Sequence, residues 1–433
     1  MTEKPGIRLL VVLLMASFAV VPILIYGCGP EWARWDAAQA NQYFRLGETD
    51  DALYQLRDAI SKSPRDPVIK LTLARRLVEL GKPDEGLKLA NEVLDLYPDN
   101  QPAMLEKAQC LQHMGDFDGA LETWLKYDKM LNAFSRGVGT LNAVAYFRSL
   151  TGKDLNVARK DIEQAVAAVN RSISWKDDDG IRAPTKALVL SAMVARCCDA
   201  TDPVLPELDR QIDLIQGQVD EFQAILLDQV YKEVSNFKTT SQIGIVRQQL
   251  REYERELAVL LTARALINQD AGKKQICNQD LDRIEKLGFD SAEIAQAMPE
   301  EQDVVSAISQ CGALLDTRGY ICSQLAWMDS ETELRRLNED RSLFNSSFES
   351  AHTDLKIALV CSQVHLKALD CQLSNSIDFY GDRETRKKDE RHTIAVIRNH
   401  LVSLYSRAER QQEALAEEQQ IREMGFEPGP GLF

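Results

Sequence analysis

Apolar positions along the chain follow two patterns, a short unbroken run near the start and a helical periodicity over the rest. The unbroken run extends from Leu9 to Tyr26 and contains no charged residue. A helix over this run would be about 27 Å long, close to the ~30 Å hydrocarbon core of a bilayer. Lys4 and Arg8 precede the run, so the positive-inside rule predicts an N-terminal transmembrane signal anchor within residues 1–30 and a periplasmic-side, extracytoplasmic location for the rest.

Two alternatives to a signal anchor remain open for this segment. Ile25, Tyr26, Gly27 and Cys28 form a tetrad that resembles the bacterial lipobox, in which the cysteine is acylated, although Tyr26 is bulkier than that motif prefers. Cys28 is therefore a candidate lipidation site, and the chain would then be a lipoprotein. The other alternative is a buried helix of a soluble protein. No A-x-A-like site follows the run, which argues against an ordinary cleaved signal.

Beyond residue 30, a set of positions recurs every 34 residues. Gly47, Gly81 and Gly115 are separated by this interval. Small residues recur seven positions before each glycine and five positions after it, at Ala40, Ala74, Ala108, Ala52, Gly86 and Ala120. Small residues allow two helices to cross closely, glycine allows a left-handed turn, and Pro64 and Pro98 would end the second helices. The interval therefore predicts successive pairs of antiparallel helices.

This pattern resembles the tetratricopeptide repeat, with units at 33–66, 67–100 and 101–134. The resemblance implies that each helix pair covers the apolar face of the next pair, so that the units stack into a superhelix. The sequence departs from the family at two places. The usual tryptophan early in the first helix is Asp36, Lys70 and Met104 here, and the third unit has Asn132 where the proline is expected.

The later segments keep the helical periodicity but lose the strict interval. We expect a degenerate helix pair plus a helix over 138–200, with Ala145, Gly152, Ala158 and Ala165 in repeat-like order. Degenerate helical repeats are predicted over 275–390, where Leu314–Tyr320 resembles a first helix. A repeat-like pair is predicted over 391–424, where Val402, Tyr405, Ala414 and Ile421 fit the pattern, followed by a tail at 425–433.

Two seams with heptad-like spacing lie within residues 202–268. The first consists of Leu208, Ile212, Ile215, Val219, Phe222 and Leu226, and the second of Val246, Leu250, Tyr253, Leu257 and Leu260. They predict a long antiparallel hairpin whose seams face the core, with a partner-binding seam as the alternative. The predicted fold class is all-α: a tetratricopeptide-like α-solenoid of antiparallel helix pairs, with an inserted helical hairpin and one N-terminal transmembrane helix.

The low content of glycine and proline supports long helices, and the net charge argues against some classes of binding partner. The 433 residues include only 22 glycines and 14 prolines, and the formal net charge is −15. An acidic chain lacks the basic footprint of a nucleic-acid binder and would be repelled by an anionic bilayer surface. We therefore expect protein or peptide partners, a membrane contact only through the N-terminal helix, no nucleic acid and no small-molecule substrate.

Motifs that carry chemistry are absent from the sequence or incomplete in it. There is no phosphate-binding loop and no H-E-x-x-H, and the five histidines are not at metal-ligand spacing, so they are predicted to lie on helix surfaces. Asp177–Gly180 fails the EF-hand pattern because Trp175 and Lys186 stand where carboxylates are needed. The eight cysteines after Cys28 form no C-x-x-C pair and are expected to be buried thiols, with disulfides as the alternative. No catalytic, cofactor-binding or metal-binding residue is predicted, and an enzyme with an unrecognised site in 200–390 is the minor alternative.

The family resemblance implies a groove lined by the first helices of the repeats. Carried over residue by residue, the groove positions are Arg34, Asn41, Arg45, Arg75, Glu79, Glu106, Gln109, Gln112 and His113. A carboxylate clamp of the chaperone-receptor type is disfavoured because Ala37 replaces the lysine that it requires. The function predicted is a membrane-anchored scaffold that binds partner peptides or helices in this groove, in the cell envelope. The alternative is a lipoprotein subunit of an envelope assembly machine.

Overall fold

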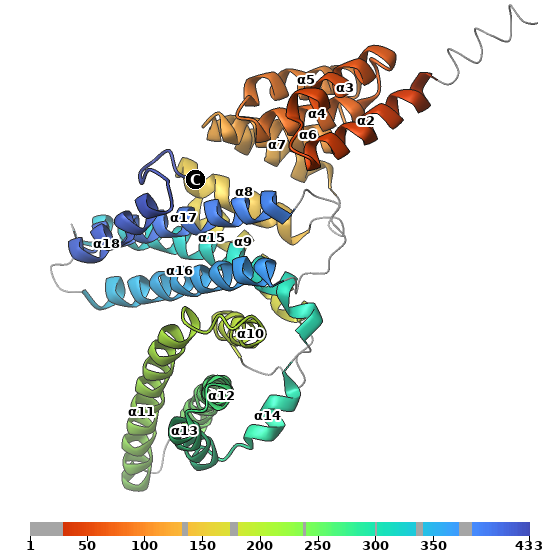
Figure 1. The fold of residues 1–433 in the computed structure, drawn as a ribbon. Coiled ribbons are helices and arrows are strands. Elements are labelled where there is room, and N and C mark those ends of the chain that lie inside the picture. Colours follow the sequence, from red (N-terminus) through yellow and green to blue (C-terminus); the bar gives the residue numbers. More distant parts are fainter. Residues whose placement is uncertain are drawn as a thin grey trace, which may run out of the picture. The chain divides into compact units, whose positions relative to one another are not determined.

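The computed structural model describes residues 29–131, 137–173, 181–236, 240–298, 301–334, 341–371 and 383–433, where all regular secondary structure is helical (Figure 1). The chain divides into two compact units, Met1–Arg136 and Gly137–Phe433. Among the helices of the described ranges, none is both long enough and apolar enough to cross a bilayer. Four features of the sequence analysis lie outside those ranges: the predicted anchor at Leu9–Tyr26, the candidate lipidation site Cys28, Asn132 of the third unit, and the Asp177–Gly180 loop.

The first unit is a series of three helix pairs. Its helices are α2 (Gly29–Arg45), α3 (Thr49–Lys62), α4 (Pro67–Glu79), α5 (Pro83–Leu96), α6 (Gln101–His113) and α7 (Phe117–Met130). Gly47, Gly81 and Gly115 occupy the turns within the pairs, with φ of 79°, 72° and 76°, a left-handed conformation that glycine adopts without strain. The helix pairs predicted from the 34-residue interval are therefore present.

Small residues form the crossing point of each pair. Ala40, Ala52, Ala74, Ala108 and Ala120 are fully or almost fully buried. Gly86 lies so close to the preceding helix that an added Cβ would be 2.9 Å from the Ala74 carbonyl oxygen. The side chains of Asp66, Asn100 and Asp116 accept hydrogen bonds from backbone N–H groups in the first turns of α4, α6 and α7, which fixes where those helices begin.

The positions that replace the family's tryptophan are buried. Met104 fills its site with an apolar side chain, whereas Asp36 and Lys70 are charged. Each charge is paired with the second helix of its own pair: Asp36 with Lys62 at 2.8 Å, and Lys70 with Glu92. A charge at a buried position is tolerated when it is paired in this way, so these departures leave the helix pairs intact.

The second unit begins with a helix pair and the long hairpin. Its first helices are α8 (Val138–Thr151), α9 (Leu155–Ser172), α10 (Ala183–Cys197), α11 (Val204–Asn236), α12 (Thr240–Asp270), α13 (Lys274–Lys286) and α14 (Ser291–Ala297). α11 and α12 contact each other in the segment where the hairpin is predicted. Leu208, Ile212 and Ile215 are fully buried, and the Phe222 and Tyr253 rings lie 5.3 Å apart, so the seams pack into the core.

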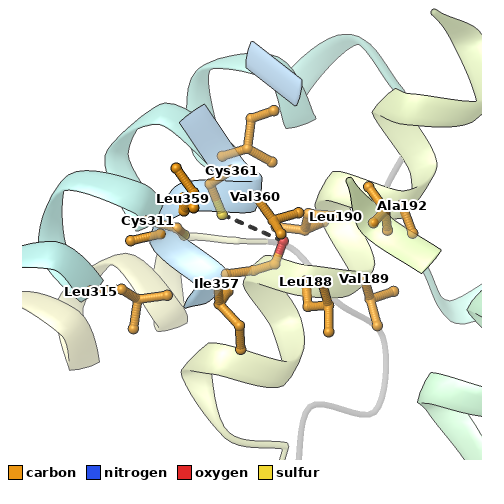
Figure 2. Packing of buried hydrophobic residues seen from close by; sticks show 14 of the residues in the cluster. Leu188, Val189, Leu190, Ala192, Cys311, Leu315, Ile357, Leu359, Val360 and Cys361 are labelled. Carbon is orange, nitrogen blue, oxygen red and sulfur yellow. Dashed lines mark hydrogen bonds between the residues drawn. The ribbon is translucent and has the colours of Figure 1, made fainter. Parts of the chain in front are cut away.

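α10 is the centre of the second unit. It contacts α9, α11 and α12, as well as α15 (Glu301–Leu334) and α16 (Arg341–Asp370). Every residue from Thr185 to Ala192 is buried, including Lys186. Figure 2 shows Leu188 and Leu190 on the side of α10 that carries apolar contacts with α15 and α16. A helix whose middle is buried on all sides is typical of a core element, and the neighbouring helices pack around this one.

α15 and α16 differ from the degenerate repeats expected over 275–390. Leu314–Tyr320, which resembles the first helix of a degenerate repeat in the sequence, lies in the middle of the 34-residue helix α15. Gly319 does not mark a turn, because it lets α15 approach α16 closely: an added Cβ would be 2.9 Å from Leu355 Cγ and 3.1 Å from the Ala351 carbonyl oxygen. Gly319 therefore serves the packing of α15 against α16 and does not end a helix.

The chain ends with α17 (Arg383–Arg407), α18 (Gln411–Glu423) and an ordered tail. Ala414 and Ile421 of α18 are buried, as the repeat-like pattern predicts. Asn399 of α17 holds the tail through its side-chain amide. It accepts a hydrogen bond from Gly429 N at 3.0 Å and donates to the carbonyl oxygens of Gly429 and Leu432. Leu432 is thereby buried against the last helix pair.

Candidate partner-binding face

The first helices of the three pairs form a continuous row. α2 contacts α4, and α4 contacts α6, whereas the second helices α3, α5 and α7, described along their whole length, make no such contacts with one another. Helices that touch directly lie on the inner side of a curved stack, and helices that spread apart lie on its outer side. The row of first helices therefore occupies the concave side of this unit.

Exposed residues follow this row at helical spacing. On α4 they are Val68, Arg75 and Glu79, with the half-buried Thr72 between them, and the opposite side of the helix is buried. We call this stripe the first-helix face. Its exposed members are Arg34, Val68, Arg75, Glu79, Gln109 and His113, and its half-buried members are Asn41, Thr72 and Gln112. Asn41, Arg75 and Gln109 stand 34 residues apart and so occupy the same position in successive pairs.

Arg34 links the first pair to the second. Its Nε donates to Asp66 Oδ2 at 3.1 Å, and Asp66 also accepts a hydrogen bond from Val68 N at the start of α4. The Arg34 side chain nevertheless remains 62% exposed. The residue therefore has a fixed position and still presents most of its surface to a partner.

Arg76 forms hydrogen bonds with two of the predicted groove residues. Its guanidinium donates to Asn41 Oδ1 at 3.2 Å and to Glu79 Oε2 at 2.7 Å. The same guanidinium lies 4.9 Å from the centroid of the Phe44 ring. These contacts tie α2 to α4 and orient Asn41 and Glu79 before any partner binds.

Glu106 corrects the predicted groove list, because it is buried. Only 2% of the residue is exposed, so a partner on the face cannot reach it. Its Oε1 accepts hydrogen bonds from Arg75 Nε at 2.8 Å and from Arg75 Nη2, while its Oε2 has no hydrogen-bond partner. Burial raises the pKa of the Glu106 carboxyl, and Arg75 opposes that shift. Glu106 is thus an anchor for Arg75.

The remaining predicted groove residues lie on α6 or at the end of α2. Gln109 and His113 are exposed and Gln112 is half-buried, all on the same side of α6. The side chain of Arg45 lies outside the described parts of the chain. Val68 was missed by the residue-by-residue comparison, although it is 63% exposed and follows Arg34 by one repeat interval. That interval was the signal that could have found it.

The face is chemically mixed. Arg34 and Arg75 supply positive charge, Glu79 supplies negative charge, and Asn41, Gln109 and Gln112 supply amides that both donate and accept hydrogen bonds. Such a surface suits the backbone and polar side chains of a peptide. Beneath the face lies the buried thiol of Cys110, whose pKa is raised to about 12 by burial and then by the Glu106 carboxylate.

The second unit contains histidines that the sequence placed on helix surfaces, and for His352 and His400 that prediction is wrong. Both are buried. His400 Nδ1 lies 2.8 Å from Asp316 Oδ1 and its ring stacks on Tyr320, while His352 Nε2 lies 2.9 Å from the Tyr405 hydroxyl. Each ring is accommodated in the core because a polar partner from another helix satisfies one of its nitrogens. Within the described ranges, no three His, Cys, Asp or Glu side chains are grouped so as to hold a metal ion.

Comparisons with known proteins agree with the architecture of the first unit. Residues 77–127 match the tetratricopeptide repeat family, a range that begins in α4 and ends in α7. Cellulose synthase operon protein C of Xanthomonas axonopodis pv. citri (strain 306) is 30% identical over 86 residues, which is 20% of this chain and 6% of that protein. The crystal structure of yeast Tom70 aligns over 91% of this chain and 76% of its own, at 14% identity and a TM-score of 0.25. Similarity at that TM-score supports no functional conclusion.

Proposed function

We propose that the tetratricopeptide repeats of this chain form a protein-binding scaffold whose partner, an extended peptide or a helix, lies along the first-helix face. The observation that carries this proposal is the row of contacts from α2 to α4 to α6, which places the exposed stripe on the inner side of the stack. A concave surface contacts more of an elongated ligand than a flat one does, and stacked repeats commonly bind partners in this way.

The contacts of the face favour a partner with polar and acidic side chains. Asp66 holds Arg34 in place and Glu106 holds Arg75. Because the two side chains are already ordered before a partner binds, binding loses little conformational entropy at these positions. Both remain substantially exposed, and guanidinium groups bind carboxylates through paired hydrogen bonds. Val68, which is 63% exposed, adds an apolar contact on the same face. Residues of the partner that face Glu79 would be neutral or basic.

We place this scaffold at the membrane of a bacterial-type cell envelope, with the repeats on the extracytoplasmic side. The support is the apolar run from Leu9 to Tyr26 behind Lys4 and Arg8. Tethering would confine the face to a thin layer and raise its effective concentration for other envelope proteins. The lipoprotein alternative differs at Cys28: incorporation of labelled palmitate that is lost in Cys28→Ser supports it, and incorporation that survives in that variant rules it out.

Site-specific photo-crosslinking in cells tests the binding face. A photoreactive amino acid at Val68 or Gln109 samples the first-helix face, and the same amino acid at Tyr54 or Leu96 samples exposed positions on the second helices α3 and α5. We expect a discrete crosslinked partner from the first two positions and none from the other two. Adding Val68→Glu to the Gln109 probe should remove the product, because a carboxylate at this position repels an acidic partner.

A matched double variant separates binding from folding. Val68→Glu with Gln109→Glu places two carboxylates on the first-helix face, where they repel an acidic partner, and Tyr54→Glu with Leu96→Glu places two on the outer helices. All four positions are exposed, so both variants should keep the helical content of the parent chain. If the outer variant loses the partner and the inner variant keeps it, the proposed face is wrong.

A further inference from the structure

Two cysteines from distant parts of the chain meet where α10 and α16 end. Cys198 caps α10, and Cys371 directly follows α16. The Cys371 thiol donates to the Cys198 carbonyl oxygen with an Sγ–O distance of 3.7 Å. The two thiols also influence each other: burial, and then the neighbouring Cys371, raise the pKa of the Cys198 thiol to about 12.

The backbone on both sides of this contact is held by other interactions. Cys198 N donates to Val194 O at 3.2 Å, and Arg196 pairs with Asp270 of α12 at 2.6 Å. Cys371 N donates to Lys367 O at 3.0 Å. The end of α16 is also fixed from α17, because Arg383 donates to the carbonyl oxygens of Leu369 and Asp370 and Lys387 pairs with Asp370 at 2.8 Å. The thiols are therefore brought together by the fold itself.

Accessibility distinguishes this pair from the four buried cysteines, and Cys322 is partly exposed like Cys198. Cys110, Cys277, Cys311 and Cys361 are buried, and Figure 2 shows Cys361 and Cys311 within the apolar core between α15, α16 and α10. Cys371 is exposed and Cys198 is partly exposed. Cys197 is exposed too, but its thiol donates to Met193 O at 3.3 Å, back along its own helix. Cys198 is thus the partner that the geometry favours.

We propose that Cys198 and Cys371 are an intrachain disulfide site, oxidised by thiol–disulfide exchange with a small-molecule or protein disulfide. The exposed Cys371 thiolate attacks one sulfur of the donor disulfide and releases one donor thiolate. The Cys198 thiolate then attacks the Cys371 sulfur and releases the second donor thiolate. Two cysteine thiols are oxidised, the donor disulfide is reduced to two thiols, and the two protons pass to the released thiolates.

The bond would join the ends of two core helices that are roughly 170 residues apart in the chain, and closing so long a loop restricts the unfolded state strongly. The proposal concerns the second unit and does not rest on the first-helix face. It fits the extracytoplasmic location proposed above, where disulfides form and persist. A failure of either proposal leaves the other unchanged, because the readouts involve different residues.

Oxidation of the purified full chain by oxidised glutathione tests the site. Free thiols are counted in denaturant before and after treatment, and linked peptides are identified by mass spectrometry without reduction. We expect the loss of two thiols per chain, a peptide pair joining Cys198 to Cys371, and a higher thermal unfolding midpoint that returns to its initial value on reduction.

Serine variants assign the bond. Cys371→Ser should lose no thiol pair and show no shift in midpoint on oxidation, whereas the buried-site control Cys277→Ser should behave as the parent chain. Cys197→Ser should keep the bond. If oxidation yields no linked pair while a reference dithiol in the same solution is fully oxidised, the proposal is overturned. It is likewise overturned if the bond disappears in Cys197→Ser.

Discussion

Arg75 serves two purposes on the first-helix face. Its guanidinium is available to a partner, since about half of the side chain is exposed, and it also neutralises the buried carboxylate of Glu106. A buried charge that loses its partner is strongly unfavourable, whereas replacing both members of a pair can be nearly neutral. Removing Arg75 would therefore weaken binding and folding together, which is why Val68 and Gln109 are the better positions for testing the face.

Arg75→Ala should lower the free energy of unfolding by about 1–3 kcal/mol, because Glu106 would keep its burial and lose its only hydrogen-bond donors among the described side chains. Adding Glu106→Gln should recover more than half of that loss. Denaturant unfolding of the parent, the two single variants and the double variant measures the coupling. Strictly additive effects would show that the pair does not act as a unit.

His352 should make the chain sensitive to mild acid. Burial, and then Arg210, Lys356 and Arg410, lower the pKa of its imidazole to about 3 from the ordinary 6.5. Between these pH values the unfolded chain binds a proton that the folded chain does not, so stability falls as the pH falls from 6.5. The expected slope is about 1.4 kcal/mol per pH unit.

Unfolding experiments at a series of pH values should show this slope in the parent chain and its loss in His352→Gln, which keeps a polar group near Tyr405. His113→Gln is the matched control, since His113 is exposed on α6 and its removal should leave the slope in place. Equal slopes in the parent and His352→Gln would contradict the assignment.

The residues of the face could be predicted as far as the repeat interval extends. Asn41, Arg75 and Gln109 are separated by the 34-residue interval, and Val68 follows Arg34 by the same interval. Glu106 could not be excluded from the sequence, because its burial depends on Arg75 from the neighbouring pair. The burial of His400 was even harder to predict. Its partner Asp316 is 84 residues away in the chain, and no local sequence pattern indicates that the two side chains meet.

At the scale of helices, the choice between glycine and alanine at the crossing points depends on the neighbouring pair. Ala52 and Ala120 occupy the crossing position in the first and third pairs, and Gly86 occupies it in the second. A Cβ on Gly86 would be 2.9 Å from the Ala74 carbonyl oxygen and 3.2 Å from Cys110 Sγ. The oxygen belongs to α4 of the same pair and the sulfur to α6, so the second and the third pair together limit what fits at this position.

Gly86→Ala should therefore destabilise the chain by about 1–3 kcal/mol, since the added methyl group forces α4 and α5 apart. Gly217→Ala is the matched control in the middle of α11, where a Cβ meets nothing within 4 Å. There the same substitution should stabilise by about 0.5–1 kcal/mol because alanine loses less backbone entropy. Thermal unfolding of both variants gives the signs, and a loss of similar size at the two positions would show that packing is not the cause.

The helices of the first unit were predictable and those around α15 and α16 were not, for a physical reason. Turn glycines at a fixed interval are a local signal, and Gly47, Gly81 and Gly115 give it three times. Gly312 and Gly319 look similar in sequence, but they lie inside α15, where they let Cys361, Ala351 and Leu355 of α16 come close. Whether a glycine forms a turn or allows a neighbouring helix to pack closely depends on tertiary contacts, which cannot be inferred from one sequence.

For the molecule as a whole, the distribution of the hydrophobic core decides what can fold alone. The clusters centred on Leu56 and on Val93 use residues of the first unit only. The large cluster around α10 draws its members from α8 through α18, all within the second unit. A segment that buries its own apolar surface has the principal driving force for independent folding.

The fragments 29–136 and 137–433 should therefore each fold when expressed separately. We expect the helical circular dichroism of an equimolar mixture to equal that of the chain 29–433, and each fragment to unfold cooperatively. Gly86→Ala should lower the midpoint of the first fragment alone, and His352→Gln should alter the acid sensitivity of the second alone, which links each variant to its own core. A fragment 137–433 without cooperative unfolding, or an effect of Gly86→Ala that appears only in the longer chain, would show that the two cores depend on each other.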